Sequence, residues 1–474
     1  MAEKNLFDAF AVRVSRRAVL RDIFLLGIGL PVFQMVGDSE ARAQSADAKA
    51  AGSMVSKQAF SLAERNRRWD AVRRVMARPQ WNLDALLAPS NGDSAYPRYL
   101  TQIGGRGGSA EVILTRDAAK PVYAFTGSGR NKSFWSKRLT SWTADGKLVI
   151  NDDEGSKPVV AGLKALGLDR AGTRIGIAKL TGSRFEPEGM VPSIFLDNLK
   201  SALPGVLFLP IEKWGVDAGP IDEPAMVKSA EEHDAIRRSV AAAEKAIETI
   251  ARVARPPAKH QADIWFPTFN AMFSETGEDP TRLSISLDEA SNSTLGAPVD
   301  DPLKAGQIIS QEIDATVQGY RAQVNHSIFV GGPSTPGYNY YKTAMEAAIK
   351  VLSDSIAMIV PDKTTCGQLV DHYAALVEKA NAEDSSGVVL HSSGIANLSR
   401  PRLGPTNSRR DSDIVIVPGM TFYFKPAIRM KRSVVEDVGR ENRVVQIGEH
   451  YLITDKGAVR LGKRKLVPLA TEGA

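Results

Sequence analysis

The chain has 474 residues, of which 43% are hydrophobic and 24% are charged, as is typical of a globular protein large enough for two domains. Its formal net charge of +6 is modest for this length. No block of basic residues interleaved with aromatic ones is present, so we expect no nucleic-acid partner. The single cysteine, Cys366, cannot form an intramolecular disulfide. Because Thr365 and Gln368 have the spacing of a helix capping box, we interpret Cys366 as a structural thiol.

Residues 1–43 contain the three parts of an export signal. Arg16 and Arg17 form the arginine pair of a twin-arginine signal, residues 23–36 are weakly hydrophobic, and Ala41-Arg42-Ala43 is a small-x-small cleavage site. The hydrophobic run is too short to cross a bilayer. We therefore predict a signal peptide over 1–43, a flexible linker over 44–59 and no stable membrane anchor after cleavage. The predicted location is periplasmic or secreted, through the twin-arginine route.

Residues 60–222 show alternating helical and strand patterns. A basic amphipathic helix is predicted over 62–76. It is followed by predicted strands over 85–88, 112–115, 122–125, 174–178 and 206–209 and by helices over 159–166 and 193–203. The alternation predicts an α/β domain, which ends at a proline-rich linker near residue 222.

Residues 223–474 begin with a strong helix signal, in which Ser229 and Glu232 form a capping box. Further helices are predicted over 262–274, 341–355 and 365–380, and strands over 283–287, 388–391, 414–417, 421–425 and 451–454. A hairpin is predicted over 308–331, and it places Glu312 and Asp314 on one face of its first strand because side chains alternate. Helices flanking a mostly antiparallel sheet predict an α+β domain.

Six short motifs in this order resemble the creatinase, prolidase and aminopeptidase P family, whose C-terminal domain has the pita-bread fold. The motifs are Val227-Lys228-Ser229, Leu303-Lys304-Ala305-Gly306, Gly319-Tyr320, His391-Ser392-Ser393-Gly394, Pro418-Gly419-Met420 and Ile453-Thr454-Asp455-Lys456-Gly457. The resemblance covers nearly all of the chain after the signal. It implies a pita-bread domain over 223–474, preceded by a smaller creatinase-type α/β domain over 60–222, and a homodimer.

Metal-dependent members of that family hold two divalent ions with two aspartates, one histidine and two glutamates. The resemblance places these five positions on Glu312, Gln323, Ile395, Lys425 and Gly448, with Glu449 adjacent to the last. One carboxylate, one ammonium and three neutral groups cannot offset the charge of two dications. A buried lysine also needs a carboxylate partner, such as Glu312 or Asp314. We therefore expect no metal ion and no other cofactor.

The remaining candidate residues each have two interpretations. His391 matches a substrate-contacting histidine of the family, or it is a histidine bonded to backbone at a strand end. Lys425 is a paired structural charge, or a base or anion contact. Asp314 faces the pocket, or it forms an ion pair with Lys425. Arg402 belongs to a basic group that attracts a carboxylate-bearing ligand or is simply solvated. The proton-transferring histidine of creatinase, a metal-independent member, falls near Leu295 and is therefore absent.

Three hypotheses about function follow. In the first, the protein is an exported, metal-independent hydrolase that cleaves a carbon–nitrogen bond of a small anionic metabolite or short peptide. Its catalytic residues are His391, Lys425 and Glu312, and its substrate-binding residues are Asp314, Gln323 and Arg402. In the second, it is a non-catalytic homologue that binds a ligand. In the third, it is an Xaa-Pro aminopeptidase with an altered metal set drawn from Glu312, Asp314, His391 and Glu449.

Overall fold

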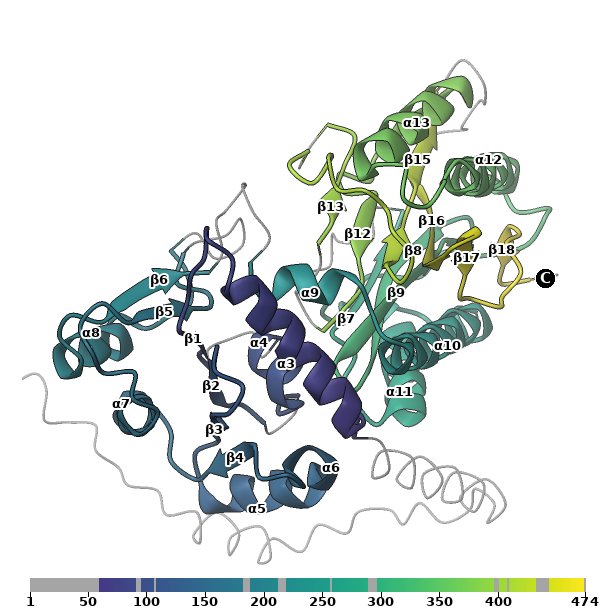
Figure 1. The fold of residues 1–474 in the computed structure, drawn as a ribbon. Coiled ribbons are helices and arrows are strands. Elements are labelled where there is room, and N and C mark those ends of the chain that lie inside the picture. Colours follow the sequence, from purple (N-terminus) through teal and green to yellow (C-terminus); the bar gives the residue numbers. More distant parts are fainter. Residues whose placement is uncertain are drawn as a thin grey trace, which may run out of the picture. The chain divides into compact units, whose positions relative to one another are not determined.

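The computed structural model describes residues 59–90, 95–105, 108–181, 188–211, 219–255, 258–288, 296–395, 400–406, 409–431 and 443–472. These residues belong to one compact unit, whose strands form two sheets (Figure 1). The predicted signal peptide and nearly all of the predicted linker lie outside the described residues, so export and the cleavage site stay predictions.

The first sheet has six strands in the order β4-β3-β2-β1-β5-β6 and is mixed, since β1 pairs antiparallel with β2 and parallel with β5. Its strands are β1 (Ala85–Ala88), β2 (Glu111–Thr115), β3 (Val122–Phe125), β4 (Leu148–Asn151), β5 (Arg174–Ile177) and β6 (Leu207–Pro210). The accompanying helices are α3 (Leu62–Met76), α4 (Ala95–Thr101), α5 (Gly129–Arg138), α6 (Thr140–Thr143), α7 (Ser156–Ala165) and α8 (Ser193–Ala202). This half has the α/β character predicted from the sequence.

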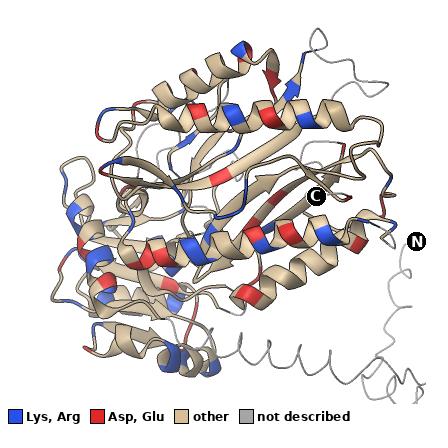
Figure 2. Ribbon diagram, turned by 90° about the vertical axis from the view of Figure 1, so that its right-hand side faces the viewer, with Lys and Arg blue, Asp and Glu red and all other residues tan. Residues whose placement is uncertain are grey.

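The second sheet has twelve strands, and its main path runs β13-β12-β14-β16-β9-β8-β10-β18. The strands are β7 (Arg282–Leu287), β8 (Ile308–Val317), β9 (Tyr320–His326), β10 (Ile328–Phe329), β11 (Ala382–Asp384), β12 (Leu390–Ser392), β13 (Arg402–Leu403), β14 (Thr421–Phe424), β15 (Ala427–Met430), β16 (Val445–Thr454), β17 (Gly457–Arg460) and β18 (Leu469–Ala470). Its helices are α9 (Asp222–Met226), α10 (Ala230–Val253), α11 (Gln261–Thr276), α12 (Tyr338–Ala357) and α13 (Cys366–Lys379). Helix α10 packs on β8 and β9, and α12 packs on β16. The long helices carry acidic and basic residues interspersed along their surfaces (Figure 2).

Local sequence signals explain the longest elements. Helix α10 begins at a complete capping box, in which Ser229 and Glu232 each bond the other's backbone N–H. The β8–β9 hairpin turns through Gln318 and Gly319, which both have positive φ values, of 53° and 83°. A two-residue turn of this kind matches the twist of the flanking strands and fixes their register. The register decides which side chains of β8 and β9 face each other.

The two sheets share a hydrophobic core. Trp69 and Leu100 from the first half pack in one cluster with Ile236, Tyr320 and Ile395 from the second. Charged side chains also pair between the halves: Arg67 Nη2 of α3 lies 2.5 Å from Glu232 Oε2 of α10. The hydroxyl of Tyr320 donates to the other oxygen of Glu232. Within the described part of the chain, we find no helix with the length and apolar character needed to cross a membrane.

One predicted strand is wrong. Over 414–417 the backbone forms no strand, and Val415 makes only an isolated bridge to Thr365. The backbone of this segment instead bonds the loop before α13, where the Ile416 N–H donates to the Thr364 carbonyl. Cys366, in the first turn of that helix, is fully buried, and burial raises the pKa of its thiol to about 12. A buried, protonated thiol agrees with the structural role predicted for it.

Candidate active site

One face of the second sheet carries most of the predicted site residues. Asp314 of β8 lies opposite Gln323 of β9, and His391 of β12 lies opposite Tyr423 of β14. Glu312 is on the same face as Asp314 because side chains alternate along a strand. All five side chains are buried, with exposed fractions of 6% or less. The hairpin therefore brings the two carboxylates to a common polar surface, as its sequence pattern predicts.

Glu312 lies at the centre of this surface. Its Oε1 accepts hydrogen bonds from Lys425 Nζ, at 2.6 Å, and from the side-chain amide of Gln323. Arg282 Nε lies 3.0 Å from the other carboxylate oxygen, an ion pair without hydrogen-bond geometry. Burial by itself raises the pKa of Glu312, but the adjacent Lys425 and Arg282 outweigh burial and lower it to about 2. Glu312 is therefore ionised at neutral pH and is the partner of Lys425.

The hydrogen-bonded chain continues from Gln323 to His391. Since the amide nitrogen of Gln323 donates to Glu312, its oxygen is left to accept from His391 Nε2, which lies 2.6 Å away. The other ring nitrogen, Nδ1, lies 3.1 Å from the backbone carbonyl of Ser392, so both nitrogens of His391 face acceptor oxygens. Burial, together with the nearby charge of Lys425, holds the pKa of His391 well below its usual range, so the ring is neutral. His391, Gln323, Glu312 and Lys425 thus form one continuous polar line.

Asp314 lies beside this line and is much less well paired. Its Oδ2 is 3.4 Å from Arg321 Nη1, and its Oδ1 is buried without a hydrogen-bond partner among the described residues. Burial raises the pKa of this carboxyl group to about 6. Of the two carboxylates predicted as partners for Lys425, Glu312 forms the ion pair, and Asp314 keeps an acceptor open within the site.

Arg402 is on the same face, because it lies opposite His391 in the register of β12 and β13. Arg400 and Arg409, which are near Arg402 in the sequence, both contact acidic residues. Arg400 Nε lies 3.0 Å from an oxygen of Asp411, and Arg409 Nη2 lies 2.8 Å from Asp371 Oδ1. Of these three arginines, Arg402 is the one placed next to His391 on the site face, as a substrate contact requires.

The remaining positions that the family resemblance assigns to metal ligands offer no oxygen or nitrogen ligand. Ile395 is 2% exposed and packs in the shared core. A Cβ atom added to Gly448 would lie 2.2 Å from the hydroxyl of Tyr423, so the tyrosine fills the space that a side chain at 448 would need. Glu449 is one residue further along β16 and faces the other side of the sheet. There it pairs with Arg464, whose Nη2 is 2.5 Å away.

The side chains at the ligand positions do not match the metal pair of the family. In the described part of the chain there is no group of three or more His, Cys, Asp or Glu side chains placed to hold a metal ion. The one carboxylate at a ligand position, Glu312, already bonds the ammonium of Lys425. Two divalent ions need several anionic oxygens, so this set of side chains does not fit them.

Three residues of the site were not predicted: Arg282, Arg321 and Tyr423. Arg321 could have been found, because it is two residues from Gln323 and must share its face. Tyr423 could have been found in the same way, because it lies two residues before Lys425 in the strand predicted over 421–425. Arg282 comes from a strand that is distant in the sequence, and only the pairing of β7 with β8 places it at the site. Leu295, where the creatinase histidine would fall, lies outside the described residues.

The strand order, the flanking helices and the preceding α/β half define the class of this protein: a pita-bread fold with a prolidase-type N-terminal half. Residues 234–455 match the model of metallopeptidase family M24. The resemblance to the creatinase, prolidase and aminopeptidase P family is thereby confirmed, and residues 234–455 form an M24 peptidase domain.

Known proteins support the same assignment. The methionine aminopeptidase of Chlamydia pneumoniae is 29% identical over 161 residues, which are 33% of this chain and 52% of that protein. The chain thus spans about half the length of the curated relatives it matches. The Xaa-Pro dipeptidase from Bacillus anthracis is 16% identical, with a TM-score of 0.63 over 86% of this chain and 99% of that one. The N-terminal domain of a FACT complex subunit from Cicer arietinum is 12% identical, with a TM-score of 0.62 over 87% of this chain and 100% of that one. At these identities the solved structures show the fold alone.

Proposed function

We propose that this protein is an exported, metal-independent hydrolase that cleaves a carbon–nitrogen bond in a small anionic metabolite or a short peptide. The observation that carries the proposal is the 2.6 Å ion pair between Lys425 Nζ and Glu312 Oε1. It pairs a fixed cation, at one position where the family resemblance expects a metal ligand, with a carboxylate at another. The M24 match supports a peptidase-type hydrolase, and the donor set supports chemistry without metal.

In this proposal, cationic side chains stabilise the negative charge that develops during the reaction. Hydrolysis of an amide or amidine builds negative charge on an atom attached to the reacting carbon, and fixed positive groups stabilise that charge. Lys425 and Arg282 supply them, while Glu312 holds both in place. The neutral His391, whose Nε2 lies 2.6 Å from the Gln323 side chain, orients Gln323 and through it Glu312. The open Oδ1 of Asp314 accepts a hydrogen bond from a substrate N–H group.

The charge balance of the site favours an anionic substrate. Arg282, Arg321 and Lys425 contribute three positive charges, and Glu312 and Asp314 contribute at most two negative ones. The balance is at least +1 before Arg402 is counted, and it rises when Asp314 is protonated. A carboxylate on the substrate is attracted to such a surface. The twin-arginine motif supports export to the periplasm or the medium, and we propose a homodimer from the family resemblance.

A second candidate is a non-catalytic, ligand-binding homologue. It is favoured by the way that Glu312, Gln323 and His391 satisfy one another, which leaves none of them as an open base. The third hypothesis, an altered metal set, loses one of its ligands because Glu449 faces the other side of the sheet.

The test combines metal analysis with a substrate screen. The purified protein is analysed for bound transition metals, then incubated with Xaa-Pro dipeptides, N-acylated amino acids and guanidino acids. We expect turnover that a chelator does not reduce, and at least a hundredfold loss in Lys425→Ala, since a single stabilising group for a developing negative charge is worth about that much. His391→Ala should also lose activity. Lys431→Ala is the matched control, because Lys431 forms an exposed ion pair with Glu378 at 2.7 Å.

Each outcome separates the candidates. Stoichiometric metal together with inhibition by a chelator would overturn the metal-free proposal. Ligand binding without turnover, weakened by Lys425→Ala, would support the non-catalytic homologue. Equal turnover by Lys425→Ala and by the Lys431→Ala control would remove Lys425 from the catalytic residues.

A further inference from the structure

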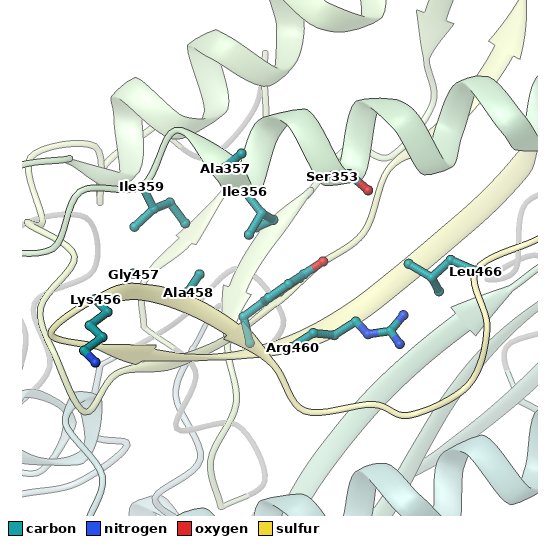
Figure 3. A pocket seen from close by; sticks show the side chains of 10 residues that line it. Ser353, Ile356, Ala357, Ile359, Lys456, Gly457, Ala458, Arg460 and Leu466 are labelled. Carbon is teal, nitrogen blue, oxygen red and sulfur yellow. The ribbon is translucent and has the colours of Figure 1, made fainter.

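A groove lies on the other face of the sheet from the polar site, between the end of α12 and the hairpin of β16 and β17. His450 shares the polar site face with Tyr423, its partner in the strand register. The next residue of β16, Tyr451, therefore faces the opposite side. The groove there has a volume of about 480 Å³, within the range of small-molecule sites. Figure 3 shows Ile356 and Ile359 on one side of it and Ala458 and Arg460 on the other.

Tyr451 lines this groove with an open hydroxyl group. The residue is only 5% exposed, yet its hydroxyl has no hydrogen-bond partner among the described residues. Its ring is held in place by Phe422, with ring centroids 6.2 Å apart. Because the hydroxyl is free to donate and its residue lines the groove, it can bond an oxygen atom of a ligand there.

Arg460 supplies a positive charge beside that hydroxyl. It lies directly opposite Tyr451 in the register of β16 and β17, so the two side chains are neighbours on one face. One nitrogen of its guanidinium donates to the carbonyl of Arg464 at 2.8 Å. Within the described ranges, no carboxylate forms an ion pair with Arg460. Glu449, two residues before Tyr451 on the same face, forms an ion pair with Arg464 at 2.5 Å.

The rest of the groove is mainly apolar and carries no negative charge. Its described lining contains Ile356, Ile359 and Leu466, a second cation at Lys456, and neither aspartate nor glutamate. Lys456 lies at the other end of the groove from Leu466 (Figure 3). An apolar trough with an arginine and a donor hydroxyl side by side is complementary to a molecule with a hydrocarbon body and one anionic head.

We propose that this groove binds a small amphipathic carboxylate, whose head bonds Arg460 and Tyr451 and whose hydrocarbon part lies on Ile356 and Leu466. The site is separate from the polar face that carries the proposed hydrolase residues, and it requires nothing from that activity. The two sites share strand β16. Its residue His450 lies on the polar site face, and the next residue, Tyr451, lies on the face with the groove.

The test uses sodium octanoate and, as its uncharged counterpart, octan-1-ol. Binding to the purified protein is followed by ligand-observed NMR and titration calorimetry. We expect octanoate to bind and octanol to bind at least tenfold more weakly. Arg460→Gln should weaken octanoate binding by about tenfold or more, and Tyr451→Phe by several-fold, because hydrogen bonds to a charged group are among the stronger ones. Lys456→Gln is the matched control, and it should change binding by less than twofold.

Several results would overturn the proposal. They are equal binding of octanoate and octanol, no detectable octanoate binding, or unchanged octanoate binding in both Arg460→Gln and Tyr451→Phe with folding confirmed by circular dichroism. A shift of the protein from dimer to monomer in Arg460→Gln, without any octanoate binding to the parent, would assign the groove to contact between two copies of the chain instead. Since the readout is binding, an inactive hydrolase site would leave this test unaffected.

Discussion

The ammonium group of Lys425 is almost enclosed, and its side chain is only 14% exposed beside a Glu312 side chain that is 8% exposed. Removing two charges from water is costly, and the cost is offset only when contacts around the pair are close and numerous. Glu312 has such contacts, with Lys425, Gln323 and Arg282 arranged around one carboxylate. The residues of this cluster therefore depend on one another for stability as well as for any chemistry.

A double-mutant cycle on Lys425 and Glu312 should reveal this dependence. Lys425→Met leaves a buried carboxylate short of one cation and is expected to lower the free energy of unfolding by roughly 2–4 kcal/mol. Lys425→Met combined with Glu312→Gln should cost clearly less than the sum of the two single changes. Urea unfolding measures all four proteins. Additive costs would show that the two side chains do not stabilise each other.

Part of this cluster could be predicted from the sequence, and part could not. Glu312, Gln323, His391 and Lys425 were predicted because each lies at a fixed offset from a recognisable motif. Their mutual contacts follow from the strand order, which the motifs imply only through the family fold. Arg282 is different, because no motif marks it and its place depends on the pairing of β7 with β8. Three-dimensional packing decides that Oδ1 of Asp314 has no hydrogen-bond partner among the described residues, and the periodicity of the sequence does not predict this.

At the scale of elements, strands β14 and β16 pack closely because residue 448 of β16 is a glycine and has no side chain. Gly448 of β16 leaves the space into which the ring of Tyr423 extends, and the tyrosine hydroxyl then reaches the side-chain oxygen of Asn325. The glycine is needed here for close approach and not for an unusual backbone angle. The contact ties β14, β16 and β9 together behind the polar line of the site.

Gly448→Ala should therefore destabilise the protein although alanine is a small residue. Its Cβ would lie 2.2 Å from the tyrosine hydroxyl and 2.6 Å from the ring carbon that bears it. Forcing such an overlap in a packed interior costs roughly 1–3 kcal/mol. Thermal unfolding measures the loss. The double variant with Tyr423→Ala should show little further cost from the alanine at 448, and an equally large cost there would contradict the overlap.

Long elements were predicted better than short ones. Helices α3, α10 and α13 begin at side-chain caps that are visible in the sequence, so their starts were predicted closely. Strands β11, β13 and β18 have two or three residues each and are defined by their partners, so they were missed. The wrong strand at 414–417 has the right composition but pairs with a loop. Apolar composition predicts burial there, and hydrogen-bond partners decide the structure.

At the scale of the whole molecule, Lys228 joins the start of α10 to the second sheet. Its backbone N–H donates to Gly419, and its Nζ donates to the Ser392 hydroxyl at 2.8 Å and to the Met226 carbonyl at 3.2 Å. The side chain is 5% exposed, and burial lowers its pKa to about 8. Together with the shared core, this contact helps the described part of the chain to behave as one unit.

The pKa of Lys228 predicts a stability change at alkaline pH. The folded protein loses this proton near pH 8, whereas the unfolded chain keeps it up to about 10.5. Between those values the unfolded state binds more protons, so the free energy of unfolding rises with pH, by up to about 3 kcal/mol. Lys228→Met should lack this rise. Urea unfolding at pH 7.5 and pH 10 compares it with the parent and with Lys350→Met, an exposed control. Identical pH dependence in all three would contradict the assignment.

The contact between Gly448 and Tyr423 also restricts how such a site can change over evolutionary time. A glutamate at 448 has room only after residue 423 has become smaller. On any mutational path between this arrangement and one with a carboxylate there, the two substitutions must therefore occur in a set order. The same tyrosine is bonded to Asn325, so the first step would itself carry a cost. A carboxylate at 448 is therefore coupled to the side chain at 423.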